Sequence, residues 1–258
     1  MLDIDAYPLF VIFPVSLVLL LGAGEVGHWL GGRAARRGAV GVSTLEAAIL
    51  GLLALMIGFT FSMALSRFEA RRDGVVVEAM AIGTTALRAR LLPAPHDSET
   101  VKLLRDYVQL RLDLVRRPLS VQEFNAEISR SNAIQEMLWQ QAKSVAAKDN
   151  AMVPTGLFLQ SLNEMIDNQE RRLAAFHDRL PPIIVIALYG VSVIAIGFAG
   201  YGNGIEAKRS RLPVHLTGVL VAAMVLLIQD IDRPGAGFIR ASQQPMANAA
   251  ATIAAFPE

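Results

Sequence analysis

The chain has 258 residues, of which 53% are hydrophobic and 18% are charged, and its formal net charge is +1. Soluble domains carry about 25% charged residues, so this composition indicates a membrane protein. A net charge this small gives no reason to expect nucleic acid as a partner. Because the chain has no cysteine, disulfides, thiolate catalysis and cysteine metal sites are excluded.

Four long apolar runs are predicted to form transmembrane helices, because each has the length that crosses the hydrocarbon core. They cover residues 8–30, 45–65, 182–201 and 212–229. Short connections join the runs in two pairs. A cleaved signal peptide has basic residues before its apolar run. No Lys or Arg precedes the first run here, so we expect this run to be retained as a membrane helix.

The second run leads without a break into a charged segment. Residues 47–65 are uncharged. At a rise of about 1.5 Å per residue they make a helix of about 29 Å, close to the thickness of the hydrocarbon core. Charged residues begin at Arg67, and no proline occurs between there and Pro93. The simplest interpretation is one helix that leaves the membrane and continues into water.

The region between the two pairs is polar and has helical patterns throughout. Pro93 ends the first of its helices, and Ser120 and Glu123 form a capping box that begins another. No segment alternates as a strand does. The expected fold class is therefore an all-α membrane protein, with four transmembrane helices in two pairs that flank a helical soluble domain. The expected divisions are 1–66 for the first pair, 67–181 for the soluble domain, 182–230 for the second pair and 231–258 for a C-terminal tail.

A sequence motif lies at the junction within this long helix. Gly58 and Phe59 end an apolar run, the sequence RFEAR follows at 67–71, and the helix reaches Leu92 and Pro93. This order resembles the second helix of bacterial bestrophins, in which a Gly-Phe pair leads into a related Arg-Phe segment and on to Leu-Pro.

A closer likeness is to a bestrophin-like family of bacterial and plant membrane proteins whose function is largely unassigned. That family reads Glu-Ala-Asn-Ala-Ile-Gly-Thr where this chain has residues 78–84, with Met80 in place of the Asn. The turn at 230–235 also looks like the family's segment after the last span. The resemblance extends to the order of two spans, a helical domain and two spans.

The resemblance implies a homo-oligomeric, pentameric ion channel in which the second helices surround a central axis. It implies that the soluble domain and both termini are cytoplasmic and that the protein lies in the inner (plasma) membrane. The basic short loops give the opposite orientation by the positive-inside rule. Their basic residues are Arg33, Arg36 and Arg37 in the first loop, and Lys208, Arg209 and Arg211 in the second. We expect the orientation that the resemblance implies.

Four residues are predicted to line the pore. Gly51, Leu55, Phe59 and Ser62, with Met63 as the alternative at the last position, recur at intervals of three or four and therefore share one helix face. By the match of the Gly-Phe pair, this face is implied to form an apolar neck, which can gate by dewetting. The alternative is that Leu55 and Phe59 pack against neighbouring helices, as most apolar residues in membranes do.

Basic residues follow the neck. Arg67, Arg71 and Arg72 are predicted to contribute charge to an inner vestibule and to favour anions. The alternative is a solvated helix face whose charges form local ion pairs. Inorganic ions, the lipid bilayer and further copies of the chain are the expected partners.

The remaining polar groups give weaker indications. Glu25 and His28 lie near the end of the first span and are interpreted as either an ion site or an interfacial pair. Asp230 and Asp232 are interpreted as either a calcium site or a helix-ending turn. Catalytic residues, cofactors and metal sites are not expected, because no nucleophile-base motif, phosphate loop or metal-ligand spacing occurs.

The alternative function is a membrane-anchored, non-conducting helical scaffold or sensor. In that case the soluble domain binds a partner through the apolar faces of residues 101–115 and 124–138.

Overall fold

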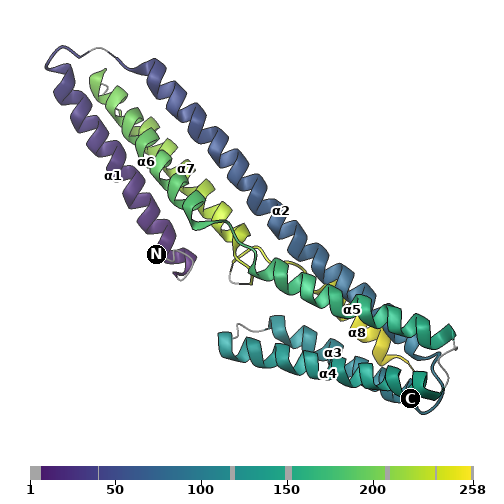
Figure 1. Ribbon diagram of the computed structural model, residues 1–258. Helices are drawn as coiled ribbons and strands as arrows, with labels where there is room; N and C mark the ends of the chain where they lie inside the picture. The colour runs from purple at the N-terminus through teal and green to yellow at the C-terminus, as the bar shows by residue number, and fades with distance from the viewer. Residues whose placement is uncertain are drawn as a thin grey trace. The chain divides into compact units, whose positions relative to one another are not determined.

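The computed structural model describes residues 7–39, 41–116, 120–148, 153–206, 210–235 and 237–256, and every regular element in these ranges is an α-helix. The helices are α1 (Leu9–Ala35), α2 (Ser43–Ala89), α3 (His96–Arg116), α4 (Val121–Lys148), α5 (Val153–His177), α6 (Pro182–Ile205), α7 (Leu212–Asp232) and α8 (Gln244–Ala254) (Figure 1). The prediction of an all-helical protein is confirmed for this part of the chain.

Four of the described stretches are long and apolar enough to cross a membrane. Three are α1, α2 and α7, and the fourth lies within Val153–Ile205, whose uncharged part is α6. These stretches match the four predicted runs, except that α1 begins one residue later, at Leu9, and they identify the chain as a multi-pass membrane protein. The prediction that the second run continues as one helix is also confirmed, because α2 is unbroken from Ser43 to Ala89.

The chain divides into two compact units. The first unit contains residues up to Arg67 together with Arg179–Ile239, and the second contains Phe68–Asp178 together with the residues from Arg240 onwards. Helix α2 contributes to both, with its apolar half in the first unit and its charged half in the second.

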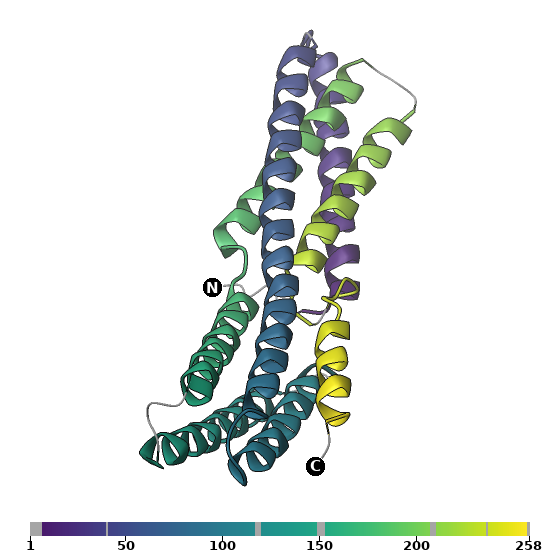
Figure 2. The same ribbon diagram turned by 90° about the vertical axis from the view of Figure 1, so that its right-hand side faces the viewer.

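The first unit is built around a close approach of α1 and α6, with α7 packed beside them (Figure 1 and Figure 2). Glycines allow this approach. A Cβ atom on Gly27 of α1 would collide with the backbone of Gly197, and a Cβ on Gly200 of α6 would collide with the backbone of Gly24. Small residues at such spacing let membrane helices pack backbone to backbone, where van der Waals contact replaces the missing hydrophobic effect.

A partly buried polar bridge also joins the three helices of the first unit. The Oγ of Ser16 on α1 lies 2.6 Å from the hydroxyl of Tyr189 on α6. The Nε2 of Gln229 on α7 donates to the same hydroxyl at 3.1 Å. Because polar groups in an apolar surrounding are costly unless they are paired, this bridge favours one register of the helices.

The second unit has an ordinary hydrophobic core. Helix α2 contributes Val75, Ile82 and Ala86 to it, and α3 contributes the predicted apolar face. Of that face, Val101, Leu104, Tyr107, Val108 and Leu112 are buried, whereas the side chain of Val115 lies outside the described residues. The capping box is confirmed, because the Ser120 amide donates to Glu123 Oε2 at 2.8 Å and the Glu123 amide donates to Ser120 Oγ at 3.2 Å.

The segment expected as a C-terminal tail contains α8, which packs against α3. Met246 and Ile253 of α8 are fully buried in the core of the second unit. The guanidinium of Arg105 on α3 donates to the backbone oxygens of Ile253 and Phe256, at 3.3 and 2.6 Å, and so holds the end of this helix. The short apolar stretch therefore completes the core of the second unit.

Candidate functional site

The residues predicted to line a pore form an exposed face of α2. Gly51, Leu55, Phe59 and Ser62 are all exposed, and 65% of Phe59 is accessible. The opposite face packs inward through Leu53, Thr60 and Ala64. The described residues therefore do not cover the predicted neck. An apolar face of this kind in a membrane helix is available to line a pore, to contact lipid or to contact another subunit.

The exposed apolar face continues into the second unit. Val77, Met80, Leu87 and Leu91 are large apolar residues, and all four are exposed. Their spacing of three, seven and four places them on one side of α2 and in the same helical phase as Phe59. We call Val77, Met80, Leu87 and Leu91 the α2 stripe. Met80, which stands where the family has Asn, is the most exposed of the four.

The three arginines predicted for the vestibule do not share one environment. Arg72 is exposed, Arg67 is partly buried and Arg71 is buried. The Nη1 of Arg67 donates to the backbone oxygen of Met63 at 3.4 Å, one turn earlier in α2. Only Arg72 has a side chain that is freely exposed on the surface of the single chain.

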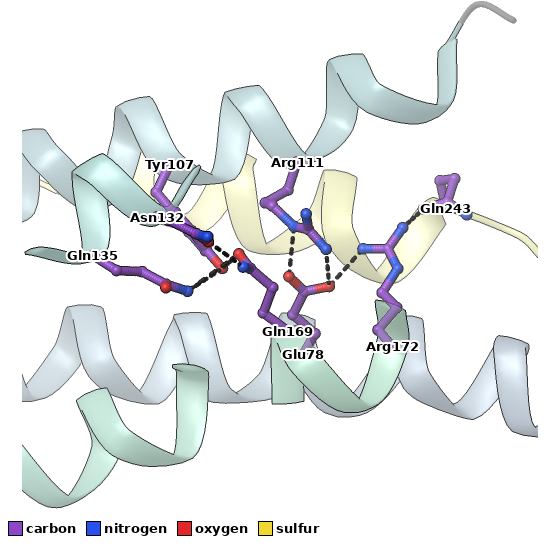
Figure 3. A network of polar contacts seen from close by, with 8 residues as sticks. All are labelled: Glu78, Tyr107, Arg111, Asn132, Gln135, Gln169, Arg172 and Gln243. Carbon is purple, nitrogen blue, oxygen red and sulfur yellow. Dashed lines mark hydrogen bonds and ion pairs between the residues drawn. The ribbon is translucent and has the colours of Figure 1, made fainter. Parts of the chain in front are cut away.

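A buried ionic network is the most distinctive chemical feature of the second unit (Figure 3). Glu78 of α2 is completely buried and accepts from two arginines. The Nε of Arg111 on α3 lies 2.6 Å from Glu78 Oε1, and its Nη2 lies 3.3 Å from Oε2. The Nη1 of Arg172 on α5 lies 2.6 Å from Oε2, and its Nη2 donates to Gln243 Oε1 at 3.0 Å. One carboxylate thus connects three helices, and Arg172 extends the connection to the segment before α8.

Neutral polar side chains continue this network in the core (Figure 3). The Tyr107 hydroxyl donates to Gln169 Oε1 at 2.7 Å. The Nε2 of Gln135 reaches both the Tyr107 hydroxyl and Gln169 Oε1, at 3.2 and 3.1 Å. The Nε2 of Gln169 donates to Asn132 Oδ1 at 2.9 Å. These amides and the hydroxyl largely satisfy one another, as buried polar groups must.

Electrostatics within the network act on Tyr107. Burial raises the pKa of the Tyr107 hydroxyl well above its ordinary value, and the negative charge of Glu78 adds to this shift. The nearby guanidinium of Arg111 acts in the opposite direction but does not reverse the shift. Tyr107 therefore stays protonated and keeps its role as a hydrogen-bond donor at physiological pH.

This network was not predicted from the sequence, because Glu78 lies in the part of the long helix that was expected to continue into water. A signal was present in the helical phase. Glu78 lies at a position between Val75 and Ile82, which face the core, and Arg111 lies four residues after buried Tyr107. Charged residues at core positions of amphipathic helices indicate buried ion pairs.

Two groups near the ends of the membrane helices are also placed by the structure. Glu25 pairs with the segment at the start of α7 and not with His28. Its Oε2 lies 2.5 Å from Arg211 Nη1, and its Oε1 lies 2.7 Å from His215 Nε2. These three side chains are partly exposed, as an interfacial cluster would be.

The acidic residues after the fourth span bind backbone groups. Asp230 accepts from the amides of Phe238 and Ile239 at 2.6 and 3.1 Å, and Asp232 accepts from the amide of Leu180. Within the described ranges no group of three or more His, Asp or Glu side chains is placed to hold a metal ion. These contacts support the helix-ending turn, the second of the two interpretations above.

Comparison with known families agrees with this architecture. A model of the bestrophin-like domain matches residues 12–246. This match covers most of the chain, so the protein belongs to the bestrophin-like family, and the predicted resemblance is confirmed. No curated protein matches the sequence.

Solved structures of a bacterial bestrophin homolog from Klebsiella pneumoniae have a similar fold. A tryptophan-to-alanine variant has a TM-score of 0.70 at 16% identity, and the match covers 95% of each chain. The structure phased on zinc has a TM-score of 0.66 at 15% identity, again with 95% of each chain covered. A tyrosine-to-alanine variant has a TM-score of 0.67 at 16% identity, over 93% of this chain and 95% of that one. At these identities the similarity is one of fold.

Proposed function

We propose that this chain is one subunit of a bestrophin-like, homo-oligomeric ion channel whose pore is lined by α2. Membership of the family supports the class of protein. The observation that carries the proposal is the exposed α2 face that contains Leu55 and Phe59, since nothing described in the chain covers it. When several copies place this face on a common axis, apolar side chains form a neck that gates by dewetting.

The α2 stripe supports assembly through the same helix. In the proposed arrangement the spans form two pairs, α1 with α2 and α6 with α7, and the second unit is a soluble domain between them. Lipid does not reach that domain, so exposed apolar side chains at Val77, Met80, Leu87 and Leu91 call for a protein surface. Further copies of α2 around a central axis supply such surfaces along the whole helix.

The finer features follow the family resemblance. We propose a pentamer in the inner membrane with the second unit in the cytoplasm, and a preference for anions. Arg72 is the exposed member of the basic group and Arg67 is partly exposed, so these two side chains are the ones available to a vestibule. Buried Arg71 acts on ions only through its field.

The test is conduction by purified protein in planar bilayers. Wild type is expected to give discrete currents, and Phe59→Ala is expected to raise conductance or open probability because it widens the apolar neck. Phe10→Ala is the matched control, since Phe10 of α1 is also an apolar membrane residue, with 75% of it exposed. A monomer by mass measurement in mild detergent, or equal currents from wild type and Phe59→Ala, would contradict the proposal.

One of the two binding surfaces expected for the alternative scaffold function is buried. Val101, Leu104 and Leu112 of α3 and Leu138 of α4 are buried in the core of the second unit. The face of α3 is therefore unavailable to a partner in the folded chain, whereas Phe124, Ile128 and Ile134 of α4 are only partly buried. A scaffold would use the α2 stripe or this face of α4, and an oligomeric structure with its axis filled by lipid or packed side chains would favour that function over conduction.

A further inference from the structure

The buried ionic network of the second unit carries an excess positive charge. It contains two guanidinium groups and one carboxylate, and the side-chain exposures are 0% for Glu78, 2% for Arg111 and 11% for Arg172. Arginine stays protonated in proteins, so this excess is not removed by loss of a proton. Glu78, Arg111 and Arg172 all act on the neighbouring Tyr107 hydroxyl, and their formal charges sum to +1.

The geometry leaves one donor of this network unused. Both oxygens of Glu78 already accept from the arginines. The Nη1 of Arg111 is shielded from solvent and has no hydrogen-bond partner among the residues that the structure describes. Gln243 accepts from Arg172, but its amide is neutral and contributes no balancing charge. A buried charge and a buried donor are thus uncompensated at the same place.

We propose that the second unit binds a small inorganic anion of the halide class at Arg111 and Arg172. Such an anion accepts from Arg111 Nη1 and neutralises the excess charge, and burying an unpaired charge is far more costly than burying a pair. A water molecule would accept the hydrogen bond but would leave the charge unbalanced. Because Glu78 and Tyr107 beside the network are fully buried, a monatomic ion suits the site better than an organic one. Arg172 is the least buried of the three charged side chains, so we expect an ion to enter on its side.

This proposal does not depend on conduction, because the network lies in the second unit and contains none of the residues of the predicted neck. It also makes the three charged side chains respond differently to replacement. Glu78→Gln leaves two uncompensated guanidinium groups and should strengthen anion binding. Arg111→Gln removes the unused donor and brings the cluster to neutrality, so it should remove anion binding.

The experiment measures the thermal unfolding of full-length protein in detergent while sodium chloride replaces sodium gluconate at constant ionic strength. Chloride is expected to raise the unfolding midpoint of wild type saturably, since a ligand that binds only the folded state stabilises it. The rise should be larger for Glu78→Gln and absent for Arg111→Gln. Arg130→Gln is the matched control and should respond as wild type does, because Arg130 forms an exposed pair with Glu127.

Two results would overturn the proposal. One is a wild-type midpoint that shows no saturable dependence on chloride, and the other is an Arg111→Gln protein that keeps the full wild-type response. If Arg111→Gln does not fold, Arg172→Gln takes its place with the same expected loss. The line width of ³⁵Cl in nuclear magnetic resonance gives a second readout, expected to broaden with wild type and with Arg130→Gln but not with the Arg172→Gln protein.

Discussion

The Nη1 of Arg172 lies 2.6 Å from Oε2 of Glu78, and this ion pair joins α5 to the charged half of α2 inside the second unit. The same carboxylate receives Arg111 of α3 at 2.6 Å. One buried carboxylate therefore holds α2, α3 and α5 together. This acceptor fixes the charged half of α2 against α3 and α5.

Glu78→Ala is expected to destabilise the second unit by about 3–5 kcal/mol, because it leaves two buried guanidinium groups without their carboxylate. Denaturant unfolding in gluconate, followed by tryptophan fluorescence, to which Trp139 of the second unit contributes, measures the change. Arg130→Ala should change stability by less than about 1 kcal/mol, since the Arg130 side chain is 69% exposed. Equal effects of the two substitutions would show that the Glu78 network contributes little to the fold.

Gly27→Ala is expected to destabilise the first unit by about 1–3 kcal/mol, because the added Cβ collides with the backbone of Gly197 and forces α1 and α6 apart. Gly22→Ala is the control on the same helix, since a Cβ there meets open space among the described residues. Thermal unfolding in detergent compares the two. A Gly27→Ala protein as stable as Gly22→Ala would contradict the close packing of α1 and α6.

Tyr107→Phe is expected to reduce the loss of stability at alkaline pH. The pKa of the Tyr107 hydroxyl is raised from its ordinary value of 10.0 by burial and by the charge of Glu78. As the pH rises, the unfolded chain therefore loses the Tyr107 proton at a lower pH than the folded protein does. The contribution of Tyr107 to stability is complete below about pH 10 and falls by up to about 1.4 kcal/mol per pH unit above it.

The measurement for this prediction is denaturant unfolding of wild type and Tyr107→Phe at a series of pH values on both sides of the ordinary tyrosine pKa. The difference between the two proteins should be constant on the acid side and should shrink on the alkaline side. Tyr7→Phe, which replaces an exposed tyrosine, is the control. A difference that does not change with pH would rule out a raised Tyr107 pKa.

Leu55→Ser is expected to raise channel conductance in planar bilayers, since a hydroxyl at the proposed neck favours water in an apolar constriction. Val18→Ser on α1 places the same hydroxyl on another exposed apolar position and should leave currents as they are. Single-channel recording distinguishes the two. A larger effect from Val18→Ser than from Leu55→Ser would place the pore away from α2.

The sequence was informative where local physics decides the structure. The uncharged residues 47–65 and the absence of proline up to Pro93 were enough to predict α2 as one helix, and Ser120 with Glu123 was enough to predict the start of α4. The partners of Glu78 were not predictable in this way. Arg111 and Arg172 lie on other helices, and only the tertiary fold decides which of many arginines meets a given carboxylate.

Two other features were missed for related reasons. Gly24, Gly27 and Gly200 share a role that appears only when α1 and α6 face each other. The C-terminal stretch was expected to be a tail because it is short and rich in small residues. Its burial depends on two residues, Met246 and Ile253, that lie seven apart and meet a core formed by distant segments.

The packing of α8 has a consequence for how the protein is made. The core of the second unit is assembled from a segment before α6 and a segment after α7, so the polypeptide leaves this unit, forms two further spans and returns to it. During translation the ribosome must therefore finish the last span before Met246 and Ile253 become available. Until then the core of the nascent second unit lacks these two side chains. The second unit can therefore complete its folding only after the last span has been synthesised.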